Sequence, residues 1–267
     1  MTMSEKTLTG QWAIILGASS GFGAATARAL AREGCHIVGV HLDRKATMPA
    51  VHALVEEIEA QNVKALFFNI NASSEEKRAE VLNALAERGV ERVKILMHSL
   101  AFGTLLPYFP EETEDKAMRR DRMEMTLDVM SHSLVYWSQD LYRAGLLGEG
   151  GRVFAMTSSG GTRVIESYGA VSAAKASLES HIRQIASELG HVGVTANSIR
   201  AGVTDTPALR MIPGHEKLLE EARKRNPFGR LTTPEDVADA IVALSGPGGR
   251  FISGNIIGVD GGEDIVG

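Results

Sequence analysis

The stretch Trp12-Ala-Ile-Ile-Leu16-Gly17-Ala-Ser-Ser-Gly21-Phe-Gly23 decides the fold of this chain. It begins with a continuous apolar run, which is typical of a strand buried on both faces of a parallel sheet. A glycine-rich turn follows, and then an alanine-rich helical pattern over residues 24–33. Glycines in such a turn let the backbone approach a pyrophosphate, which then lies against the amide donors of the helix N-terminus. The stretch therefore predicts a strand, a phosphate-binding turn and a helix.

The glycine spacing in this turn is Gly-x3-Gly-x-Gly, which differs from the commonest dinucleotide fingerprint. A glycine triad alone is also compatible with a tight turn that binds nothing. The preceding strand and the following helix favour a nucleotide site. We assign six cofactor-binding residues to the turn: Gly17, Ser19, Ser20, Gly21, Phe22 and Gly23.

The same alternation of strand and helix continues along the chain. Short apolar or β-branched runs predict seven strands, at 12–16, 36–41, 64–68, 93–98, 152–157, 194–199 and 255–259. Helical spacing predicts helices at 24–33, 50–60, 75–88, 123–142 and 173–189. Ser73 with Glu76 fits a capping box, and Thr233 before Pro234 and Asp236 fits a helix start. We predict one doubly wound Rossmann-type α/β domain over 1–267, with a seven-stranded parallel sheet and helices on both faces.

Composition excludes several classes of protein. The 267 residues are 44% hydrophobic, enough for a sizeable core, and the net charge of −5 leaves no basic surplus for nucleic acid or an anionic membrane. The single Cys35 excludes an intramolecular disulfide or a multi-cysteine metal site, and we expect no metal. No apolar run is long enough to span a bilayer, and no signal peptide is evident. We expect a cytoplasmic protein.

The end of the second predicted strand bears on the choice of cofactor. An acidic side chain there favours a free ribose hydroxyl, and a cation accommodates a 2′-phosphate. Asp43, Arg44 and Lys45 offer both signs, and the two cations favour NADP(H) over NAD(H). A solvated charged turn is the alternative interpretation.

Two further strand ends belong to the same edge of the sheet, where open α/β sheets bind ligands. We expect Asn69 and Ile70 to line the nucleotide crevice, with Asn69 pairing with adenine. Ser99 and Ala101 follow the fourth strand and are assigned to the same crevice, whereas His98 is given no catalytic role.

Tyr168 and Lys175 are candidates for catalysis, and we also assign Lys175 to the cofactor site, where it would hydrogen-bond the nicotinamide ribose. They are seven residues apart on a predicted helix, so both share one face, about 10.5 Å apart along the axis. We expect the ammonium to lower the pKa of the phenol and make it a useful acid. Without the glycine turn, the pair would be interpreted as surface residues.

These motifs together resemble the short-chain dehydrogenase/reductase family over nearly the whole chain, from Gly17 to the terminal 259–262 stretch. Two departures from the majority pattern, at 98–102 and in the seven-residue gap, resemble the divergent branch of bacterial enoyl-acyl-carrier-protein reductases. The segment 205–223 is most similar to its NADPH-using Bacillus-type subgroup, called the FabL type. The resemblance also assigns Gly202 and Thr206 to the cofactor site and implies a homotetramer.

Ser158 keeps a second activity open. It stands ten residues before Tyr168, where the best-known enoyl reductases have a tyrosine. Counted from Lys175, it also falls where the ordinary family has its catalytic serine, so we include Ser158 with Tyr168 and Lys175 as catalytic candidates. Reduction of a 3-oxoacyl thioester or another ketone is therefore the alternative, and a non-catalytic dinucleotide sensor is a third.

The spacing favours reduction of an alkene. Moving tyrosine from four to seven residues before the lysine shifts it by about 4.5 Å, one helical turn. That shift suits an enoyl thioester, in which hydride goes to a carbon two positions from the carbonyl while Tyr168 stabilises the enolate oxygen. Apolar residues after the fourth and sixth strands predict a mobile substrate loop at 203–228. The alternative is that these residues pack a subunit contact or the loop itself. Arg210, Lys217, Arg223 and Lys224 near it would meet an acidic acyl carrier or form a solvated face.

Overall fold

The computed structural model describes residues 6–111 and 116–266. A seven-stranded sheet forms its centre, in the order β3-β2-β1-β4-β5-β6-β7, and every neighbouring pair is parallel. The strands are β1 Trp12–Leu16, β2 His36–His41, β3 Ala65–Asn69, β4 Ile95–His98, β5 Arg152–Thr157, β6 Thr195–Ala201 and β7 Ile256–Val259. The prediction of seven parallel strands is confirmed.

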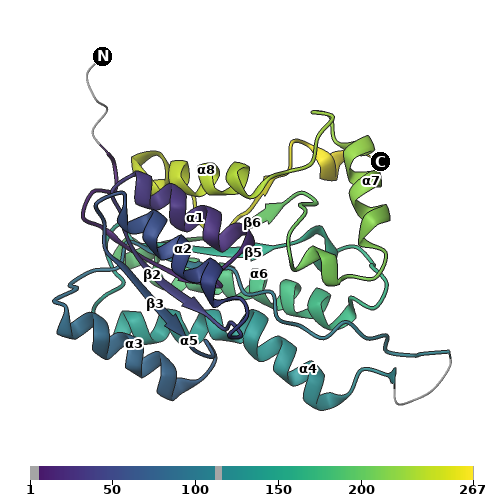
Figure 1. Cartoon of the computed structure of the whole chain (residues 1–267), viewed down its shortest axis with the longest axis horizontal. Helices are drawn as coiled ribbons and strands as arrows, with labels where there is room; N and C mark the ends of the chain where they lie inside the picture. Colours follow the sequence, from purple (N-terminus) through teal and green to yellow (C-terminus); the bar gives the residue numbers. More distant parts are fainter. Residues whose placement is uncertain (1–5, 112–115, 267) are drawn as a thin grey trace.

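Helices cover both faces of the sheet (Figure 1). On one face lie α1 Gly21–Arg32, α2 Met48–Glu59 and α8 Pro234–Ser245, and on the other α3 Glu75–Glu87, α5 Ser133–Arg143 and α6 Gly169–Leu189. The remaining helices are α4 Arg120–Leu127 and α7 His215–Arg225. The doubly wound α/β fold is therefore confirmed. Within the described residues, no helix is both long enough and apolar enough to cross a membrane.

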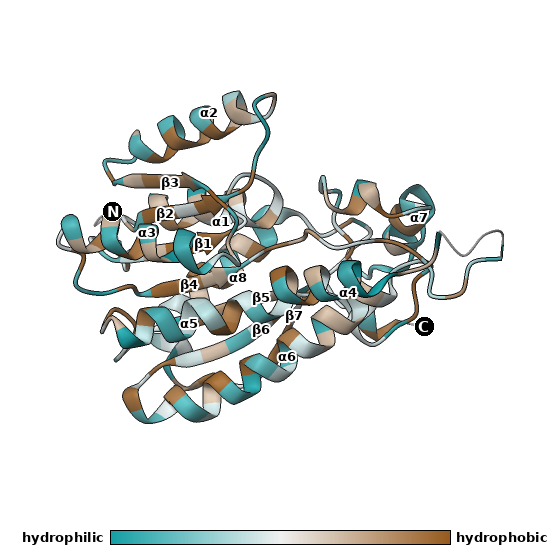
Figure 2. Cartoon of the chain, turned by 90° about the horizontal axis from the view of Figure 1, so that it is seen from below, coloured by the Kyte–Doolittle hydropathy of each residue, from teal (hydrophilic) through white to brown (hydrophobic). Residues whose placement is uncertain are grey.

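Each face of the sheet has its own apolar core. Alternate residues of β1 serve the two cores: Ile14 and Leu16 pack with Trp137 of α5, whereas Ala13 and Ile15 pack with Leu30 of α1. All five residues of β1 are buried, because parallel strands covered on both faces have no polar side. Figure 2 shows this as brown strands between helices that carry teal residues.

The predicted helix at 123–142 lies within a continuous helical stretch, 120–143, that contains a π-helical turn. Its middle, Asp128–His132, is a π-helical turn between α4 and α5. The Ser133 hydroxyl donates to the Val129 carbonyl at 2.8 Å, and back-bonding of this kind competes with the helical ladder and bends helices.

Two helix starts differ from the expected caps or bounds. The cap of α3 is Ser74, which accepts from the Lys77 amide, rather than Ser73, whose amide is bound by the Asn71 side chain. The capping box at Thr233 and Asp236 is confirmed. Helix α6 begins at Gly169, so Tyr168 is its N-cap residue and lies just outside the helix on which we predicted it.

The segment 203–228 contains more regular structure than a loop. A short 3-10 turn, Leu209–Met211, precedes α7. Helix α7 lies at the end of the molecule where the C-terminus also lies (Figure 1).

Candidate active site

The glycine turn follows β1 at the carboxyl edge of the sheet, between β2 and β4. Gly17 has φ +88°, and a Cβ there would collide with the Ser99 carbonyl at the end of β4. A Cβ on Gly23 would collide with the Gly17 carbonyl, so α1 approaches the turn as closely as the backbone allows. Strand order reverses at this point, where open α/β sheets bind nucleotides.

The N-terminus of α1 is open to an anion. Its N-cap Ser20 makes no side-chain capping hydrogen bond, so the first amides and the positive end of the helix dipole face the turn. Gly21 also has positive φ, +51°, and the methyl carbon of Thr206 lies 3.6 Å from where its Cβ would be. The structure thus brings Thr206, from the 203–228 segment, to the turn, and its contact with the cofactor stays a prediction. Phe22 is half-buried against the core.

The ends of β2 and β3 are joined by Asp43 and Asn69. The Asp43 amide donates to Asn69 Oδ1 at 2.9 Å, and Asn69 Nδ2 donates to the Asp43 carbonyl at 3.0 Å. The Asn69 side chain therefore braces the neighbouring loop, a role that we did not predict, and its pairing with adenine stays a prediction. Ile70 continues this edge, with its amide donating to the His41 carbonyl.

The Asp43 carboxylate is held from several sides. Thr47 Oγ1 donates to Oδ1 at 2.7 Å, and His41 Nδ1 lies 3.0 Å from Oδ2. Burial opposes ionisation, but hydrogen bonds from Ser19, Thr47 and His41 outweigh it and lower the pKa of Asp43. Arg44 and Lys45 are exposed.

Tyr168 lies at the start of α6, and its phenol is buried, with 8% of the residue exposed. Burial raises its pKa, and a hydrogen bond with Ser158 acts in the opposite direction. The structure thus brings two predicted residues together. The neighbour Ser167 has φ +58°, a left-handed conformation that is rare outside glycine and gathers at functional sites.

Lys175 lies in the second turn of α6, on the face toward β5. Its Nζ donates to the Met156 carbonyl at 2.7 Å, and burial lowers its pKa to about 8, while the nearby Glu179 carboxylate raises it. We predicted that this ammonium lowers the pKa of Tyr168. In the structure, burial raises the phenol's pKa, and the Lys175 ammonium is turned toward the strand carbonyl instead.

An apolar cluster surrounds the phenol. Tyr168 packs with Val171 of α6 and with Ile212, Leu209 and Leu105, which come from the segments after β6 and β4. The two apolar segments that we expected at one mouth therefore meet there. A cavity of about 360 Å³ adjoins Leu105 and is lined by Thr104, Leu105, Leu106, Ala117, Arg119 and Arg122.

Three of the four cations that we predicted near the substrate loop, Arg210, Lys217 and Lys224, pair with carboxylates. Arg210 pairs with Asp205 at 2.7 Å, Lys224 with Glu220 at 2.5 Å and Lys217 with Glu221 at 3.7 Å. This pairing reduces the positive field that we expected an acidic carrier to meet, and it favours a solvated face for these residues.

The remaining predicted residues line the same edge of the sheet. Gly202 follows β6, and a Cβ there would crowd Thr232 and Glu263. The Ser99 amide donates to Leu16, and Ala101 is exposed two residues further. Among residues 6–111 and 116–266, no group of three or more His, Cys, Asp or Glu side chains could hold a metal ion.

Two buried residues lie near Lys175: Glu179, which we did not predict, and His98, to which we gave no catalytic role. Glu179 is buried and accepts from Thr157 Oγ1 at 2.5 Å; its place one turn after Lys175 was a visible signal. His98 is fully buried with Nε2 2.9 Å from Ser133 Oγ, and Nδ1 has no partner among the described residues. Burial and the Lys175 charge lower the pKa of His98 to about 3, so the ring is neutral.

The profile of the family described as Enoyl-(Acyl carrier protein) reductase matches residues 17–263. Among curated proteins, the chain is 29% identical over 262 residues to an NADPH-dependent aldehyde reductase-like protein, chloroplastic, of Arabidopsis thaliana, covering 96% of this chain and 94% of that one. It is also 29% identical over 235 residues to the enoyl-[acyl-carrier-protein] reductase [NADH] FabI of Aquifex aeolicus, covering 87% and 84%.

Solved structures of this kind of protein have the same fold as the chain. The enoyl-[acyl-carrier-protein] reductase (NADH) of Aquifex aeolicus VF5 superposes with a TM-score of 0.83 at 26% identity, covering 98% of this chain and 99% of that one. A short chain dehydrogenase from Burkholderia cenocepacia J2315, solved in complex with NADP, gives a TM-score of 0.81 at 28% identity, covering 97% and 99%.

Proposed function

The chain belongs to the enoyl-(acyl carrier protein) reductase family of short-chain dehydrogenases/reductases and is an NAD(P)H-dependent oxidoreductase; on this premise, we propose that it reduces the double bond of a trans-2-enoyl thioester with NADPH. The observation that carries the proposal is the place of Tyr168. Its phenol lies in an apolar cluster with Leu105, from the segment after β4, and with Leu209 and Ile212, from the segment after β6. A phenol surrounded by apolar side chains suits an acyl chain whose thioester oxygen needs one donor.

The residues at the glycine turn fit a dinucleotide. Gly17 and Gly23 leave room where a Cβ would collide with backbone, and the N-terminus of α1 offers amides to a pyrophosphate. Gly17, Ser19, Ser20, Gly21, Phe22 and Gly23 would hold the phosphates, with Ser99, Ala101, Gly202 and Thr206 nearby. When bound, the reduced nicotinamide supplies hydride.

Tyr168 acts as a hydrogen-bond donor in this proposal. Because burial raises its pKa, the phenol stays protonated at neutral pH and donates to the thioester oxygen, stabilising the negative charge that develops there. Lys175, whose buried ammonium lies beside β5 and donates to the Met156 carbonyl, would hold the nicotinamide ribose. The apolar cluster excludes water from the reacting carbon.

The preference for NADPH rests on the end of β2. Both oxygens of Asp43 already accept hydrogen bonds from His41 and Thr47, whereas Arg44 and Lys45 are exposed beside it. A 2′-phosphate would therefore find two cations and a carboxylate that is engaged elsewhere. We expect Arg44→Ala to lower kcat/KM for NADPH about tenfold with little change for NADH, because one charge-assisted contact is lost.

Reduction of a carbonyl is the second candidate. The hydrogen bond between Ser158 and Tyr168 favours it, because a serine beside the phenol can also bind a ketone oxygen. The Arabidopsis relative is named an aldehyde reductase. A dinucleotide sensor without turnover is the third candidate and would show binding with no oxidation of NADPH.

The deciding experiment follows NADPH oxidation with crotonyl and acetoacetyl thioesters. We expect turnover of the crotonyl substrate and a loss of about 10²-fold or more in kcat for Tyr168→Phe, because one oxyanion donor is removed. Turnover of acetoacetyl thioester alone would establish the carbonyl activity instead. Binding of NADPH by fluorescence in the Tyr168→Phe variant is the control for an intact cofactor site.

The proposal also covers the oligomeric state of the protein and its location in the cell. Strand β7 is the sheet edge, and Ile256 on it and Phe251 before it are exposed. An apolar edge of this kind pairs readily with another chain, and we propose that it packs against a second copy in a cytoplasmic homotetramer. Light scattering coupled to gel filtration measures the mass, and a monomer at micromolar concentration would contradict it.

A further inference from the structure

The Glu263 carboxylate lies between the two ends of the 203–228 segment. It follows β7 in a short 3-10 turn, and only 3% of the residue is exposed. Its Oε2 accepts from the Val203 amide at 3.0 Å, and its Oε1 accepts from Arg225 Nη2 at 3.0 Å. Val203 begins the segment, and Arg225 is the last residue of α7. One side chain therefore bridges both ends.

The chain around Glu263 is shaped for this contact. Gly202 has no side chain, and a Cβ there would lie 2.9 Å from Glu263 Oε2. Asp260 fixes the turn from the other side, because its carboxylate accepts from the amides of Gly262 and Asp264 at 2.9 and 3.2 Å. A buried carboxylate is costly without a partner, so Arg225 and the Val203 amide account for its burial.

The next residue, Asp264, links the same turn to residues 158–168, which connect β5 to α6 and include Tyr168. Asp264 pairs with Arg163 at 2.9 Å and with Arg200 at 3.0 Å. Arg163 lies between Ser158 and Tyr168 in the sequence. The turn 263–265 thus contacts both the segment that supplies Ile212 and Leu209 to the phenol and the connection that carries the phenol.

We infer that Glu263 is a positioning residue that holds the 203–228 segment closed over Tyr168 by joining its two ends. The inference rests on the proposed function for the identity of the substrate only. Glu263→Gln removes the charge opposite Arg225 but keeps the volume of the side chain. Glu216→Gln is the matched control, because Glu216 is an exposed carboxylate of α7 itself.

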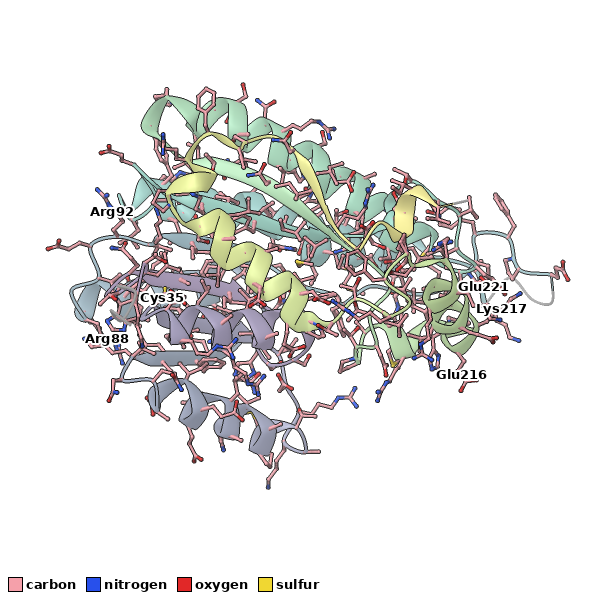
Figure 3. The ribbon with its side chains drawn as sticks, turned by 90° about the horizontal axis from the view of Figure 1, so that it is seen from above. Cys35, Arg88, Arg92, Glu216, Lys217 and Glu221 are labelled. Carbon is pink, nitrogen blue, oxygen red and sulfur yellow. The ribbon has the colours of Figure 1, made fainter. Side chains whose placement is uncertain are left out.

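Limited trypsin digestion of the full chain with NADPH, resolved by mass spectrometry, tests the inference without turnover. The segment offers exposed cleavage sites after Arg210, Lys217 and Arg223, and Arg88 and Arg92 provide reference sites. Figure 3 shows Lys217 at one end of the molecule and Arg88 and Arg92 at the other. We expect Glu263→Gln to raise cleavage within 203–228 about tenfold, because cleavage follows the open population. Cleavage at Arg88 and Arg92 should not change.

The kinetic readout is the KM for the thioester that the protein reduces. We expect KM to rise about tenfold in Glu263→Gln, with kcat within about threefold, and Glu263→Asp to recover part of the loss. Equal cleavage in Glu263→Gln and Glu216→Gln, or a rise at the reference sites as large as in the segment, would overturn the inference. An absence of enoyl reduction with a selective rise in cleavage would instead refute the proposed function and leave Glu263 in its role.

Discussion

Replacing Lys175 by methionine should change how the stability of the cofactor-free protein depends on pH. The ammonium is buried in α6, with 6% of the residue exposed, and burial lowers its pKa from 10.5 to about 8. A lowered pKa for a cation means that the folded protein binds this proton less tightly than the unfolded chain does. Lys175 therefore destabilises the fold whenever it is charged, and methionine removes that penalty.

The magnitude follows from the pKa. Each tenfold change in proton affinity corresponds to about 1.4 kcal/mol, so the depression from 10.5 to about 8 is worth about 3 kcal/mol. The penalty is complete below pH 8 and disappears as the pH rises through 10.5, because the unfolded chain then loses the proton as well. At pH 7, methionine also leaves the Met156 carbonyl without its donor, which costs about 1–3 kcal/mol. We expect the variant to be as stable as the unmodified protein or up to about 2 kcal/mol more stable at pH 7.

Urea unfolding at pH 7, 8, 9, 10 and 10.5 measures the effect. The free energy of unfolding of the unmodified protein, minus that of Lys175→Met, should rise by about 3 kcal/mol across this range. Other groups titrate in both proteins and cancel in the difference. Lys217→Met is the matched control, because its side chain is 82% exposed, and its difference curve should be flat. A flat curve for Lys175→Met as well would refute the argument that burial of this ammonium is costly.

Three further predictions follow from other parts of the fold. Gly17→Ala should weaken NADPH binding tenfold or more and lower the free energy of unfolding by well over about 1 kcal/mol, because its Cβ would collide with the Ser99 carbonyl. Gly10 also has positive φ but lies in open space, so Gly10→Ala should lower the free energy of unfolding in urea by only about 1 kcal/mol. Arg78→Met should lower the free energy of unfolding by about 3 kcal/mol, because it leaves the Asp140 carboxylate without its buried partner. The double variant Arg78→Met with Asp140→Leu should recover most of that loss, and no recovery would contradict the ion-pair explanation. Thr233→Ala removes a helix cap and should cost about 1 kcal/mol by calorimetry; an unchanged melting temperature would count against it.

Local sequence patterns were enough to predict the sheet. The run 12–16 is apolar at every position because β1 is covered on both faces, and its bounds in the structure are the predicted ones. The glycine turn was also predictable from its residues, because the backbone at Gly17 has φ +88°, a conformation that favours glycine. Helical periodicity over 123–142 could not reveal the π-helical turn, because the back-bond from Ser133 to Val129 changes the ladder without changing the apolar pattern.

The contacts of the candidate site were less predictable because their partners are distant in sequence. The spacing of Tyr168 and Lys175 indicated a shared site, but the carbonyl that binds the ammonium belongs to Met156 on β5. Burial reversed the expected direction of the phenol's pKa, and periodicity does not predict how deeply a helix N-terminus is covered. Glu263 contacts Val203 across 60 residues, so no local pattern marks it.

The position of β1 between β2 and β4 has a consequence for how the chain folds during synthesis. Ala13 pairs with Ile37 on one side and with Ile95 on the other, and the second partner leaves the ribosome much later. Leu16 and Val40 also await α5 and α6 to cover them. The nascent N-terminal half therefore exposes an uncovered apolar sheet until the later helices emerge, and non-local pairings of this kind fold slowly and expose the chain to aggregation.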